Sequence, residues 1–140
     1  MTAESAKADR VNVMIVDDSF LMRRVIRNIL EKDVVFNVVG EAANGLEALE
    51  AVNTLKPDII LLDIEMPKMD GLEFLRHSRL LTTARIIIIS SVAQLGSPQA
   101  LEALSLGATD IVPKPSGVLS MDLEESRSSE LLDIIRSAVA

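Results

Sequence analysis

Val11-Asn12-Val13-Met14-Ile15-Val16-Asp17-Asp18-Ser19 joins a short apolar run to two adjacent carboxylates and a hydroxyl. Runs of similar length, most of them rich in β-branched residues, recur at Val34 to Val39, Asp58 to Leu62, Arg85 to Ile89 and Asp110 to Val112. Short, continuously apolar runs are typical of parallel strands that helices cover on both faces. The sequence therefore predicts five parallel strands, and the first of them ends at Asp17.

The segments between these runs have the periodicity of amphipathic helices. Ser19 is a suitable N-cap for the first helix, in which Arg23, Arg24 and Arg27 are expected to point outward. The other helices are expected after Gly45, near Gly71, from Ser97-Pro98 to Gly107, and from about Ser129 to Val139. Their buried faces are expected to contain Met22, Val25, Ile26, Ile29, Leu46, Leu49, Val52, Leu72, Leu75, Leu131, Leu132, Ile135 and Val139. Strands that alternate with helices predict one doubly wound α/β domain of (βα)₅ type.

The composition limits the classes of protein to which the chain can belong. Its 140 residues, 49% of them hydrophobic, fit one folded domain over residues 11–140, preceded by a flexible leader, residues 1–10. The net charge of −7 opposes binding to nucleic acids and to anionic membranes. No apolar run approaches the roughly 20 residues of a membrane span, and the absence of cysteine excludes disulfides and thiolate metal sites. We expect a soluble, cytoplasmic protein.

Polar side chains stand at the ends of four predicted strands. Asp17 and Asp18 follow the first strand, Asp63 the third and Lys114 the fifth, while Ser90 ends the fourth. Doubly wound sheets bind ligands beyond the carboxyl ends of their strands, where the strand order reverses. In the common order 2-1-3-4-5 the first and third strands are neighbours. The three carboxylates are therefore expected to lie close together.

Three clustered carboxylates repel one another unless a cation offsets their charge. Mg²⁺ prefers oxygen ligands and is commonly held by one or two carboxylates together with phosphate oxygens. Lys114 and Ser90 would suit the oxygens of a phosphoryl group, and a carboxylate can accept that group as a nucleophile. Taken singly, each residue has an ordinary explanation as a helix cap, a strand end or a surface lysine. Their joint occurrence at one edge of the sheet favours a phosphoryl-transfer site.

Several motifs resemble those of one family, the receiver domains of two-component response regulators. They are Val16-Asp17-Asp18-Ser19, the stretch from Leu62 to Gly71 (Leu-Asp-Ile-Glu-Met-Pro-Lys-Met-Asp-Gly), Ile89-Ser90-Ser91, Gly107-Ala108 and Lys114-Pro115. The resemblance implies a flavodoxin-like fold and phosphorylation of Asp63 by a histidine kinase, followed by autodephosphorylation. It also implies that Asp18, Asp63 and the main-chain carbonyl of Glu65 bind Mg²⁺, with Asp17 acting through water, and that Ser90 and Lys114 hold the phosphoryl oxygens.

Within this family, Val112-Pro113-Lys114-Pro115-Ser116-Gly117 is similar to the regulatory domain of the chemotaxis protein-glutamate methylesterase. A methylesterase domain is expected to follow such a receiver, but the sequence contains no Gly-x-Ser-x-Gly elbow, and His77 is its only histidine. His77 is expected at the surface or its boundary. The sequence is therefore interpreted as either a fragment or a stand-alone receiver.

The chain departs from the family pattern at Ile111, where the resemblance predicts an aromatic residue that reports phosphorylation. We still expect the surface of the fourth strand, the fifth strand and the helix after each to shift, through Ser90 and the packing around Ile111. Glu65 and Val92 occupy positions that border the attacking water in the family. The Lys114-Pro115 bond is a candidate cis peptide.

Three other functions compete with this interpretation. A pseudo-receiver would act as an interaction scaffold without phosphate chemistry, but the acidic pair, Asp63, Ser90 and Lys114 are all present. A phosphatase with an aspartyl nucleophile expects a second aspartate where this chain has Glu65. A flavin-binding protein is disfavoured because the chain has neither tyrosine nor tryptophan to stack on the ring.

Overall fold

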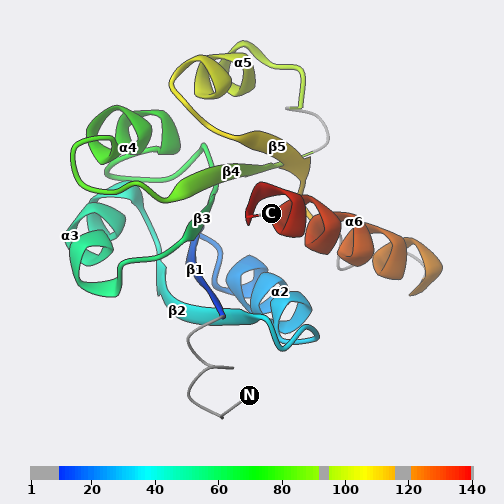
Figure 1. Ribbon diagram of the computed structural model, residues 1–140. Coiled ribbons are helices and arrows are strands. Elements are labelled where there is room, and N and C mark those ends of the chain that lie inside the picture. Colours follow the sequence, from blue (N-terminus) through cyan, green and yellow to red (C-terminus); the bar gives the residue numbers. More distant parts are fainter. Residues whose placement is uncertain (1–9, 92–94, 116–120, 140) are drawn as a thin grey trace.

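A computed structural model describes residues 10–91, 95–115 and 121–139, without side-chain detail for residues 121–129. Strands and helices alternate in the order β1 (Val11–Val16), α2 (Phe20–Leu30), β2 (Phe36–Ala42), α3 (Gly45–Leu55), β3 (Ile59–Leu62), α4 (Gly71–Ser78), β4 (Arg85–Ser90), α5 (Pro98–Ser105), β5 (Asp110–Pro113) and α6 (Met121–Val139) (Figure 1). The strands form one parallel sheet in the order β2-β1-β3-β4-β5. The predicted fold and strand order are confirmed. The expected leader lies outside the described residues, apart from Arg10.

The sheet is the middle layer of three. Helices α2 and α6 cover one face, and α3, α4 and α5 cover the other (Figure 1). Alternate residues of β1, β3 and β4 supply the two core clusters, because successive strand side chains point to opposite faces. The strand residues facing α2 and α6 are Val13, Ile15, Ile59, Leu61, Ile87 and Ile89. Those facing the other helices are Met14, Val16, Ile60, Leu62, Ile86 and Ile88.

Strand β2 differs most from its predicted bounds. It runs from Phe36 to Ala42, whereas the apolar run predicted Val34 to Val39. The carboxylate of Asp33 accepts a hydrogen bond from Val35 N at 3.0 Å, which shapes a turn before the strand and leaves Val34 81% exposed. At its other end, β2 continues through Glu41 to pair with the last residues of β1. Pairing with β1 therefore overrides the weak strand propensity of Gly-Glu-Ala.

The helices begin largely where the sequence predicts. Ser19 and Ser97 are N-caps, accepting hydrogen bonds from Met22 N at 3.1 Å and Ala100 N at 3.2 Å. Gly107 follows α5 with φ +110°, which favours glycine. No helix in the described part of the chain is long and apolar enough to cross a membrane.

Two of the predicted buried leucine and valine positions are wrong. Leu46 is 45% exposed and Val139 is 37% exposed, whereas Ala48 and Ala138 face the core. The core side of each helix is thus occupied by a small alanine. The prediction had chosen the larger neighbours, Leu46 and Val139, because they are more hydrophobic. Helix α6 also begins at Met121, well before the predicted Ser129. Its first turns are polar, so no apolar stripe marked its start.

Candidate functional site

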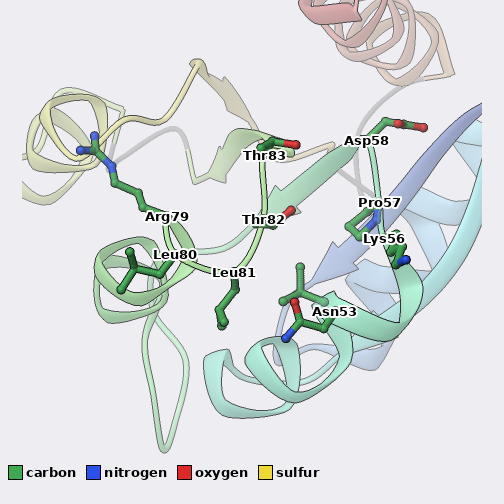
Figure 2. Close-up of a pocket in the computed structure, with 10 residues that line it drawn as sticks. Asn53, Lys56, Pro57, Asp58, Arg79, Leu80, Leu81, Thr82 and Thr83 are labelled. Atoms are coloured by element: carbon green, nitrogen blue, oxygen red, sulfur yellow. The ribbon is translucent and has the colours of Figure 1, made fainter.

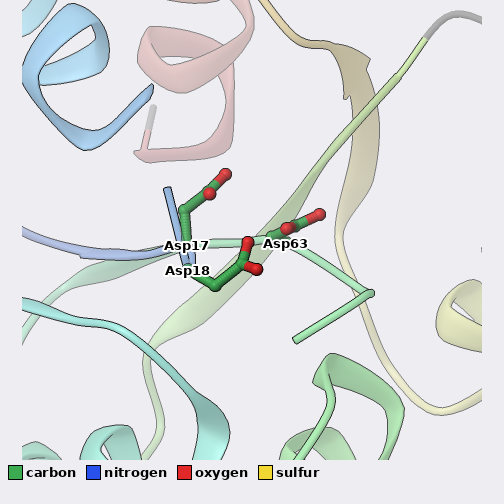
Figure 3. A group of neighbouring side chains, drawn as sticks. All are labelled: Asp17, Asp18 and Asp63. Carbon is green, nitrogen blue, oxygen red and sulfur yellow. The ribbon is translucent and has the colours of Figure 1, made fainter. Parts of the chain in front are cut away.

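The ends of β1 and β3 bring three carboxylates together (Figure 3). Asp17 and Asp18 follow β1, Asp63 follows β3, and one carboxylate oxygen from each lies within 4.8 Å of the others. Hydrogen bonds from Asp63 N to Val16 O (2.9 Å) and from Asp17 N to Ala42 O (3.1 Å) continue the strand pairing into the site. Asp17 and Asp63 are buried, whereas Asp18 is exposed. The predicted acidic cluster is therefore present.

Lys114 lies against this cluster. Its Nζ is 3.4 Å from Asp17 Oδ2 and 3.4 Å from Asp63 Oδ2. Lys114 N donates to Ser90 O at 2.7 Å, so the end of β4 determines where the lysine leaves β5. The structure thus brings Lys114 to the two buried carboxylates and anchors it to Ser90, as expected from the strand ends.

The buried carboxylates have perturbed pKa values. Burial, followed by the charge of Asp17, raises the pKa of Asp63 from 3.8 to about 6, although Lys114 opposes the increase. Burial likewise raises the pKa of Asp17, against a hydrogen bond from Ser19 N and the charge of Lys114. Burial alone would lower the pKa of Lys114, but the two carboxylates raise it overall. One lysine therefore does not fully offset the acidic cluster.

Among the described residues, two buried polar atoms of the site have no hydrogen-bond partner, Asp17 Oδ2 and Ser90 Oγ. The second oxygen of Asp17, Oδ1, accepts from Ser19 N at 2.8 Å. Asp17 Oδ2 lies 3.4 Å from Lys114 Nζ without a well-formed hydrogen bond, which fits a cation ligand. A buried hydroxyl without a partner among the described residues fits an anionic oxygen. Together with the excess of negative charge, these atoms could hold a divalent cation and a phosphoryl group.

Two glycines hold the loop that follows Asp63, a role that the sequence pattern alone did not indicate. Gly71 N donates to Ile64 O at 2.7 Å, and Gly45 N donates to Met69 O at 2.8 Å. A Cβ on Gly71 would lie 2.3 Å from Asp63 O, and one on Gly45 would lie 2.8 Å from Met69 O. Helices α3 and α4 therefore pack directly on the backbone of the site. Gly71 belongs to the motif quoted above, but only the packing shows its role.

The outward direction predicted for the arginines of α2 is right only for Arg24, which is exposed. Arg23 and Arg27 turn toward Glu41 near the end of β2, at 2.9 Å and 2.6 Å respectively. The sequence did offer a signal for these ion pairs. Glu41 is the one charged residue of β2, and the two arginines are spaced one helical turn apart on α2.

Four further sequence predictions concern the Lys114-Pro115 bond and the surroundings of His77, Ile111 and Glu65. The described residues contain no cis peptide bond, so the Lys114-Pro115 bond is trans and the cis candidate is wrong. His77 is exposed and Ile111 is half-buried against the core. Glu65 is exposed on the loop after β3. Val92 lies outside the described residues.

A separate hollow of about 480 Å³ lies at the opposite ends of the strands (Figure 2). It is bordered by residues that precede β3, such as Pro57 and Asp58, and by Thr82 and Thr83 before β4. None of the residues predicted for the phosphoryl-transfer site lines it. The chemistry indicated by the sequence is therefore confined to the carboxyl edge of the sheet.

Comparison with known proteins agrees with this geometry. A family profile described as the response regulator receiver domain matches residues 13–122. The chain belongs to the response regulator receiver family. Among solved structures, the receiver domain resembles the response regulator domain of Thermotoga maritima CheB, with a TM-score of 0.81 and 40% identity, covering 92% of this chain and 96% of that one. This likeness confirms the fold expected from the sequence.

Two further similar proteins indicate which receiver domains this chain most resembles. The receiver domain is 46% identical over 129 residues to a protein-glutamate methylesterase/protein-glutamine glutaminase of Halalkalibacterium halodurans. It also resembles a chain in the complex of CheY6 with the P1 domain of CheA3 from R. sphaeroides, with 47% identity and a TM-score of 0.77, covering 92% of this chain and 96% of that one. The predicted resemblance to the methylesterase regulatory domain is confirmed. The match covers 92% of this chain but only 37% of the methylesterase.

Proposed function

We propose that this receiver domain accepts a phosphoryl group on Asp63 beside a bound Mg²⁺. The main support is the cluster of three carboxylates, with Lys114 Nζ 3.4 Å from an oxygen of each buried one, Asp17 and Asp63. Asp18, Asp63 and the main-chain carbonyl of Glu65 would hold the cation, and Asp17 would hold it through water. Ser90 and Lys114 would bind the oxygens of the phosphoryl group, consistent with the partnerless hydroxyl of Ser90.

In this reaction, an oxygen of ionised Asp63 attacks the phosphorus of the donor. The new bond joins Asp63 to phosphorus, and the bond between phosphorus and the donor's leaving group breaks. Because the pKa of Asp63 rises only to about 6, this carboxyl is mainly ionised at pH 7 even without a metal. Bound Mg²⁺ would supply charge neutralisation for the phosphoryl oxygens. Lys114 brings a second positive charge to the same oxygens.

Intact-mass spectrometry tests this function directly. The receiver domain is incubated with acetyl phosphate, once with Mg²⁺ and once with EDTA. We expect one phosphoryl adduct that requires Mg²⁺, because three carboxylates repel an anionic donor unless a cation is present. Reduction with borohydride followed by peptide mapping should locate the adduct at Asp63. No adduct, together with no binding of beryllium fluoride, would instead support a phosphate-independent scaffold.

The physiological donor is proposed to be a histidine kinase, and the setting a cytoplasmic chemotaxis pathway. Similarity to methylesterases and to the structure that contains CheY6 and the P1 domain of CheA3 supports this assignment. By the same similarity, residues 11–140 would act as a regulatory domain that controls a methylesterase domain. Incubation with a phosphorylated P1-type domain should transfer phosphate to Asp63 faster than acetyl phosphate does.

We also propose that phosphorylation changes the surface formed by β4, α5, β5 and α6. Ile111 pairs with Ile88 in the sheet and packs against the core below α5, although it lacks the ring that usually reports phosphorylation. When Ser90 binds a phosphoryl oxygen, the end of β4 moves toward Asp63, and contacts around Ile111 change. Beryllium fluoride with Mg²⁺ should therefore shift amide signals from Gly96 to Val112 in NMR spectra. Unchanged signals there, with shifts confined to the loops of the site, would rule out this switch.

A further inference from the structure

The arginine Arg23 connects the acidic site to a group of charges outside it. Its Nη1 donates a hydrogen bond to the main-chain oxygen of Asp17 at 2.7 Å. Its Nε donates to Glu41 Oε1 at 2.9 Å. The side chain is only 15% exposed, so both bonds form largely away from solvent. Arg23 therefore joins the end of β1 to the end of β2 from its place on α2.

Glu41 is itself held by a second arginine. Arg27 donates from Nε to Glu41 Oε2 at 2.7 Å, and its Nη2 lies 2.6 Å from the same oxygen. The two arginines thus bind different oxygens of one carboxylate. Burial opposes the charge on Glu41, but these hydrogen bonds lower its pKa overall. Arg23 is consequently fixed by a charged acceptor that Arg27 keeps in place.

The contact with Asp17 completes the anchoring of that residue. Asp17 N donates to Ala42 O, and Asp17 Oδ1 accepts from Ser19 N at 2.8 Å. Arg23 binds the main-chain oxygen, while Asp17 Oδ2 lies 3.4 Å from Lys114 Nζ. The peptide plane that Arg23 holds is the one that links Asp17 to Asp18. Its orientation sets the direction in which both neighbouring carboxylates leave the chain.

We propose that Arg23 is a positioning residue that holds the turn of Asp17 and Asp18 in the geometry needed to bind a divalent cation, and that Glu41 and Arg27 hold Arg23. The inference rests on the proposed Mg²⁺ site. Adjacent like charges favour a turn that spreads the carboxylates apart, since repulsion falls with distance. The bond from Arg23 opposes that relaxation. Residues that orient metal ligands often affect affinity nearly as strongly as the ligands themselves.

A positioning role for Arg23 and a purely electrostatic effect of its charge predict opposite changes in Mg²⁺ affinity when Arg23 is replaced. Removing a positive charge near a cation site strengthens binding of Mg²⁺ through electrostatics alone. If Arg23 positions the ligands, Arg23→Ala should instead weaken Mg²⁺ binding by roughly tenfold. Arg23→Lys keeps the charge but cannot reproduce the two-nitrogen geometry of the guanidinium. It should therefore also bind Mg²⁺ more weakly than the wild type.

The experiment is a Mg²⁺ titration followed by NMR amide shifts, on wild type, Arg23→Ala, Arg23→Lys and the matched control Arg24→Ala. Arg24 is the exposed neighbour on α2, and its replacement should leave the affinity unchanged or slightly higher. In EDTA, the amide signal of Asp18 should shift in the Arg23 variants only, because the preceding carbonyl loses its donor. With acetyl phosphate, the Arg23 variants should need more Mg²⁺ for half-maximal uptake while approaching the wild-type rate at saturation.

The outcomes separate this inference from the function on which it rests. A wild type that binds no Mg²⁺ refutes the proposed function. A wild type that binds Mg²⁺, with Arg23→Ala binding as tightly or more tightly, overturns only the positioning role. Arg23→Lys with wild-type affinity also overturns it, since the simultaneous contacts of the guanidinium with Asp17 and Glu41 would then not be needed. If Arg23→Ala does not fold, the positioning role is tested with Arg23→Lys and Arg27→Ala. Both variants should bind Mg²⁺ more weakly than the wild type.

Discussion

Asp63→Asn is expected to abolish phosphoryl uptake from acetyl phosphate while making the metal-free protein more stable at pH 7. The loss of uptake follows because the neutral amide is not a nucleophile toward phosphorus under these conditions. Intact-mass spectrometry should show no adduct at any Mg²⁺ concentration. Asp110→Asn is the matched control: Asp110 is exposed at the start of β5, and its Oδ1 accepts from Ile111 N, which asparagine can also do. This control should accept phosphate as the wild type does.

The gain in stability follows from the charge that the variant removes. Ionised Asp63 is buried beside the carboxyl group of Asp17, and the pKa of Asp63 rises from 3.8 to about 6. Such an increase corresponds to at most about 3 kcal/mol against the folded state. Relaxation and solvent screening reduce the effect, so we expect Asp63→Asn to raise the free energy of unfolding by about 1–2 kcal/mol. Urea denaturation followed by far-UV circular dichroism in EDTA measures it.

The difference between the two proteins should depend on pH with a definite sign. Below pH 3.8, Asp63 is protonated in both the folded and the unfolded chain. As the pH rises toward about 6, the unfolded chain loses this proton first, so the wild type loses stability relative to the variant. The advantage of Asp63→Asn should therefore be small at pH 4 and greatest above pH 7. Mg²⁺ should reduce it, because the cation binds and stabilises the folded wild type. Equal stability at pH 7 in EDTA would contradict this account.

Gly71→Ala is expected to lower the free energy of unfolding on the order of 3 kcal/mol. The new Cβ would lie 2.3 Å from Asp63 O and 2.9 Å from Ile64 Cα, and both are main-chain atoms. Relief requires α4 to move away from the loop, which stretches the 2.7 Å hydrogen bond from Gly71 N to Ile64 O. The same movement displaces the main chain beside Asp63. Phosphoryl uptake should therefore also slow in the fraction that remains folded.

Gly96→Ala is the matched control for this prediction. Within the described part of the chain, a Cβ at Gly96 would meet nothing within 4 Å. The same chemical change should then alter the free energy of unfolding by less than about 0.5 kcal/mol. Thermal and urea unfolding of both variants, followed by far-UV circular dichroism, give the comparison. A Gly71→Ala protein as stable as Gly96→Ala would show that the approach of α4 to the loop is not a constraint.

Much of the site could be predicted because it is built at strand ends. A parallel sheet carries the carboxyl ends of all its strands to one edge, so Asp17, Asp63 and Lys114 had to converge once the strands were recognised. The surroundings of these residues were harder to foresee. The predicted outward direction of Arg23 failed because its partner, Glu41, lies on a strand whose end was predicted too early.

The sequence by itself determined the layered (βα)₅ fold and the residues that cluster at the carboxyl edge of the sheet. Continuous apolar runs have few ways to be buried on both faces, and the motifs adjoin the runs directly. Only the tertiary structure decided which backbone groups hold the site in shape, including the contact of Gly71 with Asp63 and the bond from Arg23 to Asp17. Such contacts depend on how closely α2 and α4 pack against the ends of the strands, to within a few tenths of an ångström. Local pattern and propensity contain no information at that scale.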